Sequence, residues 1–437
     1  MAAGERPATM RAVQYSGYGG GAAALKFVLW EIPVPSVKKD EVLVKVEAAS
    51  INQSDLMTQK GMMRPFHPKF PFIPVNNVSG EIVEVGSAVR EFKVGDKVVS
   101  KLDFWMVEEA DGSVQAAMET GEAWPACLGG DRGRGGAAGA CKGRRKPARH
   151  DWHVQAAVEA NKAAVEAAGH GTAALRICTT QGGAVGNGRS QYDARRHGGW
   201  WQRLVGCPTA GGLAEYVATS DKLTVARPAG ISAADAAGVP VAGLTALQAL
   251  KAIGTKFDGS GTSGGADVLI TAASSGVGTY AVQLAKLGNH RVTATCGARN
   301  LGLVAGLGAD EVLDYKTPEG AALSSPSGKK YDYIVNISNK NKWSVFKPRL
   351  SSHGRVVDVA PNFGNFVASV VTLFSRRKKL SLVSLKMSKE DLGLLLELMR
   401  EGKLRTVVDS RHPFEKAADA WARSLSGHAT GKVIVEM

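Results

Sequence analysis

The segment that decides the fold is residues 267–300, DVLITAASSGVGTYAVQLAKLGNHRVTATCGARN. It opens with DVLIT, a short apolar run of the kind that is buried in a parallel sheet. A turn of small residues follows at 272–278, and apolar residues then recur at helical spacing as far as Gly288. Because RVTATC is again rich in β-branched residues, the segment predicts a strand, a turn, a helix and a second strand.

A turn of this kind is typical of a dinucleotide site. Its small residues let backbone amides approach a pyrophosphate at the positive end of the helix. The glycine fingerprint is incomplete, since its three positions hold Ala273, Ser275 and Gly278. The order of strand, turn, helix and strand supports the dinucleotide interpretation. An ordinary crossover with a tight turn is the alternative.

The residues beyond the helix indicate which dinucleotide is bound. NAD sites usually carry an acidic residue about 20 positions on, which binds the ribose 2′-hydroxyl. No acidic residue lies between Thr279 and Ala309, and Arg299 follows the second strand. Because a 2′-phosphate needs a cation and is repelled by a carboxylate, we expect NADPH. A solvated loop arginine is the alternative interpretation of Arg299.

The composition is that of a large, basic, globular chain. Its 437 residues allow two or more domains, and its hydrophobic content of 44% is ordinary. No apolar run reaches the roughly 18 residues of a membrane span, and the opening MAAGERPATM predicts neither secretion nor an ordinary transit peptide. None of the five Cys forms a C-x-x-C pair, so we expect neither structural zinc nor a disulfide framework. The formal charge of +14 favours anionic partners, and it does not choose among NADPH, an anionic membrane and nucleic acid.

Two regions of regular pattern flank an irregular one. The first predicts strands at 10–15, 41–51, 80–86 and 92–99 and a short helix at 51–61. From Ser232 onward, helices alternate with strands at 311–315, 331–337 and 354–360, which is typical of a parallel α/β sheet. Near the end, Ser388 is the expected N-cap of an amphipathic helix that stops at Gly402.

Residues 102–209 interrupt the pattern. They hold five of the eight Trp and four of the five Cys, together with low-complexity pieces such as GGDRGRGGAAGACKGRRKPARH. Connections this long without periodicity are uncommon inside a compact domain. Three explanations are open: a gene-model artefact such as a translated intron, a genuine disordered insertion, or an Arg/Gly-rich arm for nucleic acid. The arm lacks interleaved aromatic residues, so nucleic acid is not an expected partner.

The segment 375–386, SRRKKLSLVSLK, is basic at its start and apolar afterwards. An anionic lipid surface attracts such clusters of Lys and Arg. Peripheral contact with an anionic membrane is therefore one interpretation of the segment. A solvated turn that precedes a sheet strand is the other.

A set of short motifs extends over nearly all of residues 10–101 and 210–437. The motifs are MRAVQYSGYGGG, INQSDLMTQKGMMRPF, GEIVEVGSAV, FKVGDKVV, GGLAEYVAT, PVAGLTALQAL, AASSGVGTYAVQLAKLG, VTATCGARN, LGADEVLDYKTPEGAALSSPSGKKYD and GHATGKVIVE. Together they resemble the zinc-independent quinone oxidoreductases, a branch of the medium-chain dehydrogenase/reductases. Within that branch they resemble the chloroplast envelope quinone oxidoreductase homologues of plants and algae.

The resemblance implies an α/β fold of two domains. A GroES-like catalytic β domain would take residues 10–101 and 210–240. A Rossmann domain with a doubly wound parallel sheet would bind NADPH with residues 241–375. Residues 376–437 would finish that sheet and return to the catalytic domain.

The same resemblance implies a set of site residues. The catalytic candidates are Asn52, Asp55 and Thr245. The candidates for holding the cofactor are Ser274, Ser275, Gly276, Val277, Gly278, Arg299, Tyr315, Ser338, His428 and Lys432. Zinc-dependent relatives use a Cys near Asn52 that this chain lacks, so no metal is expected.

The reaction implied is hydride transfer from NADPH to a small quinone or to the double bond of an α,β-unsaturated ketone. Three positions depart from the pattern of the relatives, namely Met57, Asn77 and Ser275. They keep open a second interpretation, a weakly active NADPH-binding protein with a redox-sensing or crystallin-like role. The resemblance also implies a homodimer and a chloroplast location, in the stroma or peripheral to the inner envelope. A cytoplasmic location is the alternative.

Overall fold

The computed structural model describes residues 7–62, 70–102, 211–257, 265–373, 375 and 377–437. These residues form two sheets with their helices and a separate two-stranded ribbon, within one unit of the chain. The insertion expected at 102–209 lies outside the described residues except for Leu102.

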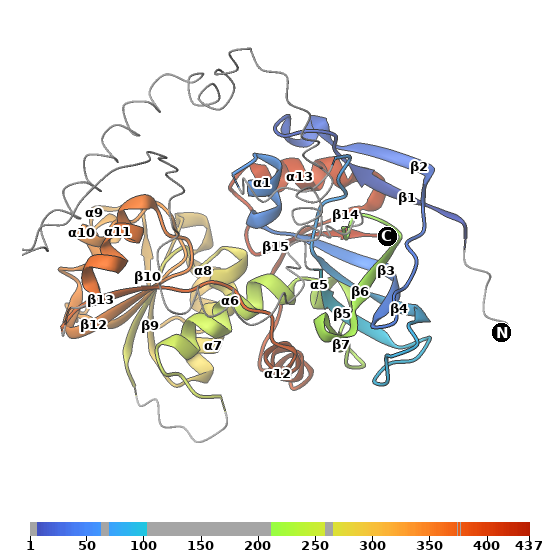
Figure 1. The fold of residues 1–437 in the computed structure, drawn as a ribbon. Helices are drawn as coiled ribbons and strands as arrows, with labels where there is room; N and C mark the ends of the chain where they lie inside the picture. The colour runs from blue at the N-terminus through green and yellow to red at the C-terminus, as the bar shows by residue number, and fades with distance from the viewer. Residues whose placement is uncertain (1–6, 63–69, 103–210, 258–264, 374, 376) are drawn as a thin grey trace, which may run out of the picture. The chain divides into compact units, whose positions relative to one another are not determined.

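The segment at 267–300 forms the centre of a six-stranded parallel sheet (Figure 1). The strands are β8 (Asp267–Ile270), β9 (Arg291–Cys296), β10 (Glu311–Asp314), β11 (Tyr331–Asn336), β12 (Leu350–Asp358) and β13 (Lys379–Leu382). They lie in the order β10-β9-β8-β11-β12-β13, so the first strand is central and the chain winds outward to both edges. This is the Rossmann strand order, which confirms the predicted fold class for this half of the chain.

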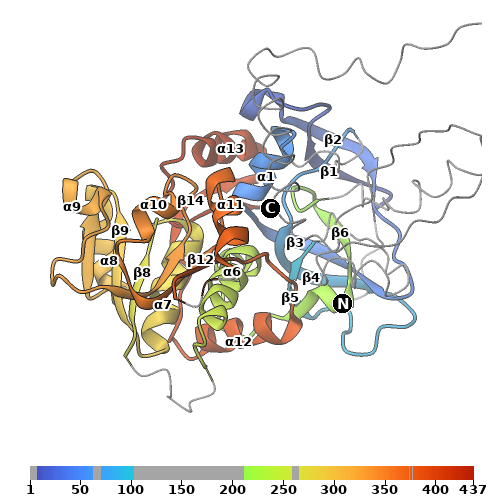
Figure 2. The same ribbon diagram turned by 60° about the vertical axis from the view of Figure 1, so that its left-hand side comes forward.

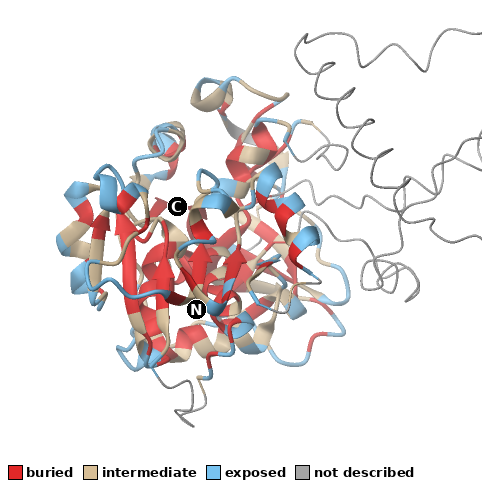
Figure 3. Ribbon diagram, turned by 90° about the vertical axis from the view of Figure 1, so that its left-hand side faces the viewer, coloured by how far each residue is buried: buried red, intermediate tan, exposed pale blue. Residues whose placement is uncertain are grey.

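Helices cover both faces of the six-stranded sheet (Figure 2). The helices are α6 (Val239–Ala252), α7 (Gly276–Leu287), α8 (Leu301–Gly306), α9 (Pro318–Ala321), α10 (Trp343–Phe346), α11 (Phe363–Thr372) and α12 (Lys389–Arg400). Val268 and Ile270 pack with α6, α7, α8 and α12, whereas Leu269 packs in the cluster of α10 and α11. Successive side chains of a strand point to opposite faces, so apolar runs such as DVLI are buried on both sides (Figure 3).

The second sheet is mostly antiparallel and combines distant parts of the chain. Its strands are β3 (Glu41–Ile51), β4 (Asn77–Val85), β5 (Lys97–Lys101), β6 (Tyr216–Ser220), β7 (Thr224–Ala226), β14 (Val408–Pro413) and β15 (Lys432–Glu436). The order is β14-β15-β3-β4-β5-β7, and β6 also pairs with β3. The last strand of the chain thus lies beside β3, with Val433 opposite Ile51.

Smaller elements complete this β domain. They are β1 (Thr9–Gln14), β2 (Lys26–Pro33), α1 (Gln53–Gln59), α5 (Ala233–Ala237) and α13 (Ala417–Leu425). Trp421 of α13 is fully buried in the apolar core of the domain, and its indole N–H donates to Gln59 of α1 at 2.9 Å. The C-terminal helix therefore fixes α1, which directly follows Asn52.

Some predictions of secondary structure need correction. The strand predicted at 92–99 begins only at Lys97, because Gly95 adopts a φ of +94° in the turn before it. The strand β2 and the helix α11 were not predicted. The apolar residues of β2 follow one another without clean alternation, whereas those of α11 recur at helical spacing, a signal that was missed. The N-cap at Ser388 is confirmed, because its Oγ accepts from the amide of Asp391 at 3.0 Å.

No helix among the described residues combines the length and the apolar character needed to cross a membrane.

Candidate active site

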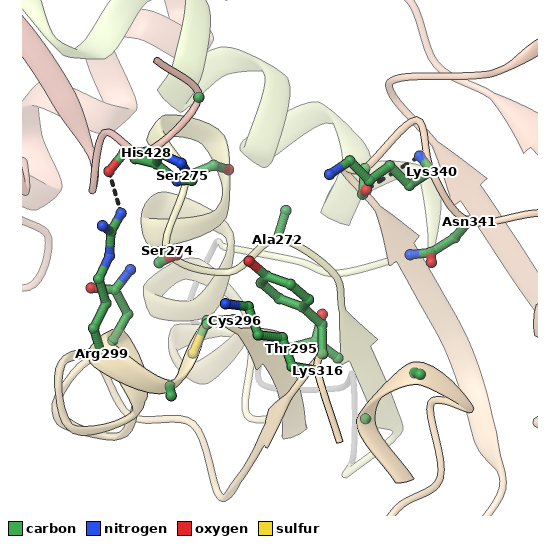
Figure 4. A pocket seen from close by; sticks show the side chains of 18 of the residues that line it. Ala272, Ser274, Ser275, Thr295, Cys296, Arg299, Lys316, Lys340, Asn341 and His428 are labelled. Carbon is green, nitrogen blue, oxygen red and sulfur yellow. Dashed lines mark hydrogen bonds between the residues drawn. The ribbon is translucent and has the colours of Figure 1, made fainter. Parts of the chain in front are cut away.

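A cavity of about 670 Å³ lies at the carboxyl ends of β8, β9, β10 and β11 (Figure 4). Its lining comes from the turn after β8, from the end of β9 and the 3-10 turn Ala298–Asn300, from residues after β10 and β11, and from the loop before β15. In open α/β sheets, ligands bind at this edge because loops from neighbouring strands diverge there. The cavity is therefore where a dinucleotide is expected.

The lining of this cavity is cationic. Arg299, Lys316 and Lys340 contribute to it, together with His428, and no Asp or Glu is among its described lining residues. The guanidinium of Arg299 donates to the carbonyl oxygen of His428, which joins the end of β9 to the loop before β15 (Figure 4). Such a lining favours an anionic ligand and suits a 2′-phosphate better than a bare ribose hydroxyl.

The turn between β8 and α7 supplies the amino end of a twelve-residue helix to the cavity. Ser275 is the N-cap, and its Oγ accepts from the amide of Gly278 at 3.1 Å. Its hydroxyl hydrogen is still available to a phosphate oxygen, so the serine that replaces a fingerprint glycine caps the helix and can also donate. The positive end of the helix favours an anion here.

Gly278 shows why this turn needs glycine at its third fingerprint position. A Cβ there would lie 2.3 Å from the carbonyl oxygen of Ala272 and 2.6 Å from the Cα of Ala273. The first turn of α7 therefore packs directly on the backbone that leaves β8. Close packing of helix on strand is the role of the third glycine in dinucleotide sites, so the turn fits a dinucleotide.

A second polar cluster lies between α1 and β15. Lys432 Nζ donates to Asn52 Oδ1 at 2.5 Å and to the carbonyl oxygen of Ile51 at 3.2 Å. The backbone amide of Asn52 donates to Asp55 Oδ2 at 2.7 Å, which forms the capping box of α1. All three side chains of this cluster (Asn52, Asp55 and Lys432) are at most 6% exposed.

Burial perturbs both ionisable groups of the cluster. Desolvation raises the pKa of Asp55 to about 7, against the opposing effects of its hydrogen bond with Asn52 and the charge of Lys432. Desolvation lowers the pKa of Lys432 to about 8, against the attraction of Asp55. Perturbed pairs of this kind are enriched at functional sites, where a proton has to be held or released near neutral pH.

The cluster contacts the start of α7. A Cβ on Gly276 would lie 2.9 Å from Lys432 Cδ, so the lysine stem packs on the glycine. The amide of Gly431 donates to the carbonyl oxygen of Ser274 at 2.9 Å, and Ser275 forms an isolated parallel bridge with Gly431. One short segment before β15 therefore joins the cluster to the dinucleotide turn.

The predicted site residues fall into three places. Those that line the cavity are Ser274, Ser275, Arg299, Tyr315, Ser338 and His428. Gly276, Val277 and Gly278 form the first turn of α7. Asn52, Asp55 and Lys432 form the buried cluster, so Lys432 lies apart from the cavity lining that His428 belongs to.

Thr245 is not among the residues that line the cavity, and its hydroxyl makes no described contact with the buried cluster. The Oγ1 donates to the carbonyl oxygen of Val241 at 2.7 Å, one turn back in α6. Lys316 and Lys340 were missed as lining residues. They follow Tyr315 and Ser338 by one and two positions, so the rule that ligands meet the carboxyl ends of parallel strands could have found them.

Two of the departures lie beside residues of the cluster or its partners. Met57 comes two residues after Asp55, and Asn77 follows Asn76, whose Oδ1 accepts from Asn52 Nδ2 at 3.5 Å. Asn77 is fully buried at the start of β4, and neither atom of its amide has a hydrogen-bond partner among the described residues. Met57 is half-buried in α1. Within the described part of the chain, no three His, Cys, Asp or Glu residues form a group that could bind a metal. Function without zinc stays a prediction.

Comparisons with known proteins agree with this architecture. Residues 38–142 match the family model "Alcohol dehydrogenase GroES-like domain", and residues 307–435 match "Zinc-binding dehydrogenase". The structure is also similar to that of a quinone oxidoreductase from Coxiella burnetii, with a TM-score of 0.66, 22% identity and coverage of 98% of this chain and 99% of the other. The fold is that of the medium-chain dehydrogenase/reductases, with a GroES-like domain and a Rossmann-like domain.

Two proteins of similar sequence indicate the family within this superfamily. The chloroplast envelope quinone oxidoreductase homologue of Arabidopsis thaliana is 43% identical over 430 residues, which are 98% of each chain. A chloroplastic NADPH-dependent alkenal/one oxidoreductase of Arabidopsis thaliana is 27% identical over 433 residues, 98% of this chain and 80% of the other. The chain therefore belongs to the quinone oxidoreductase family of this superfamily.

Proposed function

We propose that the protein is an NADPH-dependent reductase of quinones or α,β-unsaturated ketones. The observation that carries the proposal is the cationic lining of the cavity at the dinucleotide turn, which has no Asp or Glu among its described residues. Membership of the quinone oxidoreductase family supports an oxidoreductase, and the names of the two Arabidopsis relatives support quinones and enones as substrates.

Three residues of the cavity lining, Arg299, Tyr315 and Ser275, have roles in this proposal. Arg299 binds the 2′-phosphate, and its hydrogen bond to the loop of His428 holds its guanidinium in place. Tyr315, half-exposed beside Gly297, offers a ring for the adenine. Ser275 and the amide end of α7 bind the pyrophosphate. NADPH, when bound, supplies a hydride to an electron-poor carbon of the substrate.

The cluster of Asn52, Asp55 and Lys432 serves as the polar wall of the reaction site in this proposal. Lys432 fixes the Asn52 amide, because the Oδ1 must then face the ammonium and the Nδ2 must face away from it. The Nδ2 accordingly donates to the carbonyl oxygen of Ser50 at 3.1 Å and to Asn76 Oδ1 at 3.5 Å, which uses both amide hydrogens. The ammonium of Lys432 donates to two acceptors and has a third hydrogen, so it is the group of this cluster that can polarise a carbonyl oxygen without a metal. The chloroplast is the location we propose, from the names of the relatives.

Anaerobic steady-state oxidation of NADPH tests the proposal. The full chain is assayed with a panel of benzoquinones, naphthoquinones and linear enones, with NADH in parallel. We expect turnover with at least one acceptor and a kcat/KM at least about tenfold higher for NADPH than for NADH. Tight NADPH binding without turnover would favour a redox-sensing or crystallin-like role. Failure to bind NADPH would overturn the proposal.

A further inference from the structure

Residues 427–431, here called the GHATG loop, lie between α13 and β15 and contact the cofactor cavity on one side. The carbonyl oxygen of His428 accepts from Arg299 (Figure 4). Thr430 Oγ1 donates to Asn300 Oδ1 at 3.2 Å. Because Arg299 and Asn300 belong to the 3-10 turn after β9 and both line the cavity, the loop is joined twice to the turn that carries the proposed ligand of the 2′-phosphate.

An ion pair between α13 and β14 holds the GHATG loop from its other side. Arg423 of α13 donates to Asp409 of β14 through Nε at 2.7 Å and through Nη2 at 2.6 Å, so the pair is bidentate. Asp409 Oδ1 also accepts from the backbone amide of Thr430 at 2.7 Å. Arg423 Nη2 also donates to the carbonyl oxygen of His428 at 3.2 Å. The ion pair thus holds the backbone of the loop at two positions.

The carboxylate of this pair is buried and ionised. The side chain of Asp409 is 5% exposed, whereas that of Arg423 is 37% exposed. Burial alone would raise the pKa of Asp409, but the hydrogen bonds from Arg423 and from the Thr430 amide outweigh it and hold the pKa below its usual value. A bidentate pair between a guanidinium and a carboxylate has a defined geometry. The GHATG loop is therefore fixed in one place relative to α13 and β14.

The end of the GHATG loop is fixed by close packing on the residue before β14. Gly431 has a φ of +82°, and a Cβ there would lie 2.1 Å from the carbonyl oxygen of Val407. The amide of Lys432 donates to the same oxygen at 2.8 Å. Since Val407 is two positions before Asp409, one short segment of chain sets both the middle and the end of the loop.

We propose that Asp409 and Arg423 are positioning residues that set the preference of the site for NADPH over NADH. The inference rests on the proposed function, because it concerns how the same site recognises the 2′-phosphate. The guanidinium groups of Arg299 and Arg423 donate to one carbonyl oxygen, which has two lone pairs and accepts both. Asp409 balances the charge of Arg423, so the two cations can lie close together.

The ion pair acts on the 2′-phosphate only through Arg299. Neither Asp409 nor Arg423 is among the described residues that line the cavity. A guanidinium has five N–H donors, and the fixed oxygen of His428 holds Arg299 so that donors are left for the cavity that it lines. If the loop were loose, binding of the phosphate would have to order this side chain at a cost in affinity. NADH has no 2′-phosphate, so its affinity does not depend on that ordering.

Titration of the full chain with NADPH and with NADH, in the absence of any acceptor, tests the inference. The variants are Arg423→Met, Arg299→Gln and the combination of both changes. Asp409→Asn/Arg423→Met is a further variant, which avoids leaving a buried carboxylate without its partner. The matched control is Arg11→Met, which removes the ion pair of a similarly exposed arginine with Glu215 elsewhere in the β domain. Thermal unfolding is measured for each protein to confirm that it is folded.

We expect Arg423→Met to raise the Kd of NADPH by about five- to tenfold and that of NADH by less than about twofold. Asp409→Asn/Arg423→Met should behave in the same way, and Arg11→Met should bind both cofactors like the wild type. In the Arg299→Gln background, Arg423→Met should have no further effect on NADPH, because both changes remove the same contact with the phosphate.

Two results would overturn the inference and leave the proposed function standing. One is a ratio of the two dissociation constants that Arg423→Met and Asp409→Asn/Arg423→Met leave unchanged. The other is an additive loss of NADPH affinity in the combined variant, which is what a merely structural role of the ion pair predicts. A wild-type chain that binds no NADPH would instead overturn the proposed function, and the inference with it.

Discussion

Lys432 Nζ lies 2.5 Å from Asn52 Oδ1, although the two residues are 380 positions apart in the chain. The last strand of the protein thereby sets the amide at the start of α1, directly after β3. The contact is buried and charge-assisted, a combination that gives a hydrogen bond more than its usual strength.

Lys432→Met should lower the kcat of NADPH oxidation and leave the KM for NADPH nearly unchanged. The methionine fills the same space without a donor, so the Asn52 amide loses its fixed orientation. A hydrogen bond to a charged group contributes about 1.5–3 kcal/mol, and each ~1.4 kcal/mol is a factor of ten in rate. We therefore expect a kcat reduced by about 10- to 100-fold, measured in steady state.

The matched control for this prediction is Lys403→Met. Lys403 is an exposed lysine whose ion pair with Glu401 lies at the end of α12. Its replacement should change neither kcat nor KM. A Lys432→Met enzyme with wild-type kcat would show that the buried cluster has no part in the reaction.

Asp55→Asn should change how stability depends on pH. Burial raises the pKa of Asp55 from 3.8 to about 7 in the folded protein, so folding takes up a proton between these values. The contribution of Asp55 to the free energy of unfolding is therefore largest below about pH 4. It decreases as the pH rises toward 7, by at most ~1.4 kcal/mol per pH unit. The asparagine cannot ionise and still accepts the amide hydrogen bond at Asn52.

Urea unfolding of both proteins at a series of pH values measures this effect. The free energy of unfolding of the wild type, minus that of Asp55→Asn, should decrease between pH 4 and pH 7. Lys432 titrates above this window, since its pKa is lowered only to about 8. Parallel pH profiles of the two proteins would mean that Asp55 is ionised throughout the range and that burial does not raise its pKa.

The register of β15 against β3 explains why the sequence could not predict this cluster. The resemblance carried by GHATGKVIVE implied that Lys432 holds the cofactor together with His428, and this role stays a prediction. The motif did not indicate that Lys432 lies against Asn52. Strand pairing sets Val433 opposite Ile51, and side chains alternate along a strand. Lys432 is thereby turned to Asn52. Such pairing depends on contacts across the whole chain, and no local pattern reports it.

Local patterns predicted the Rossmann half of the chain well. Its strands, such as DVLIT and RVTATC, are buried on both faces and therefore stand out in the sequence as short apolar or β-branched runs. The same reasoning failed for α11, whose apolar residues would ordinarily face a core. The buried side of that helix is chosen by Asn365 and its hydrogen bond to Asp358. A polar residue that pairs inside the protein leaves no periodic signal in the sequence.

Gly278→Ala should destabilise the Rossmann domain and abolish NADPH binding. Its Cβ would meet the Ala272 carbonyl oxygen at 2.3 Å, and the helix start must move away from the turn. Changes of this kind cost roughly 2–4 kcal/mol. Gly393→Ala in α12 is the control, because a Cβ there meets nothing within 4 Å and should stabilise the helix by up to ~1 kcal/mol. If both variants unfold at the wild-type temperature, the turn is not packed as the structure has it.

Arg299→Gln should convert the enzyme from a preference for NADPH toward NADH. The guanidinium lies in a lining without a described carboxylate, so its loss removes a charge that only a 2′-phosphate uses. We expect the KM for NADPH to rise by about 10- to 100-fold, the KM for NADH to change less than about threefold, and kcat to stay near the wild-type value. Arg291→Gln is the matched control, since Arg291 pairs with Asp267 at the amino ends of β8 and β9, the opposite edge of the sheet. An equal loss of affinity for NADPH and NADH in Arg299→Gln would mean that this arginine supports the loop of His428 and does not bind the 2′-phosphate.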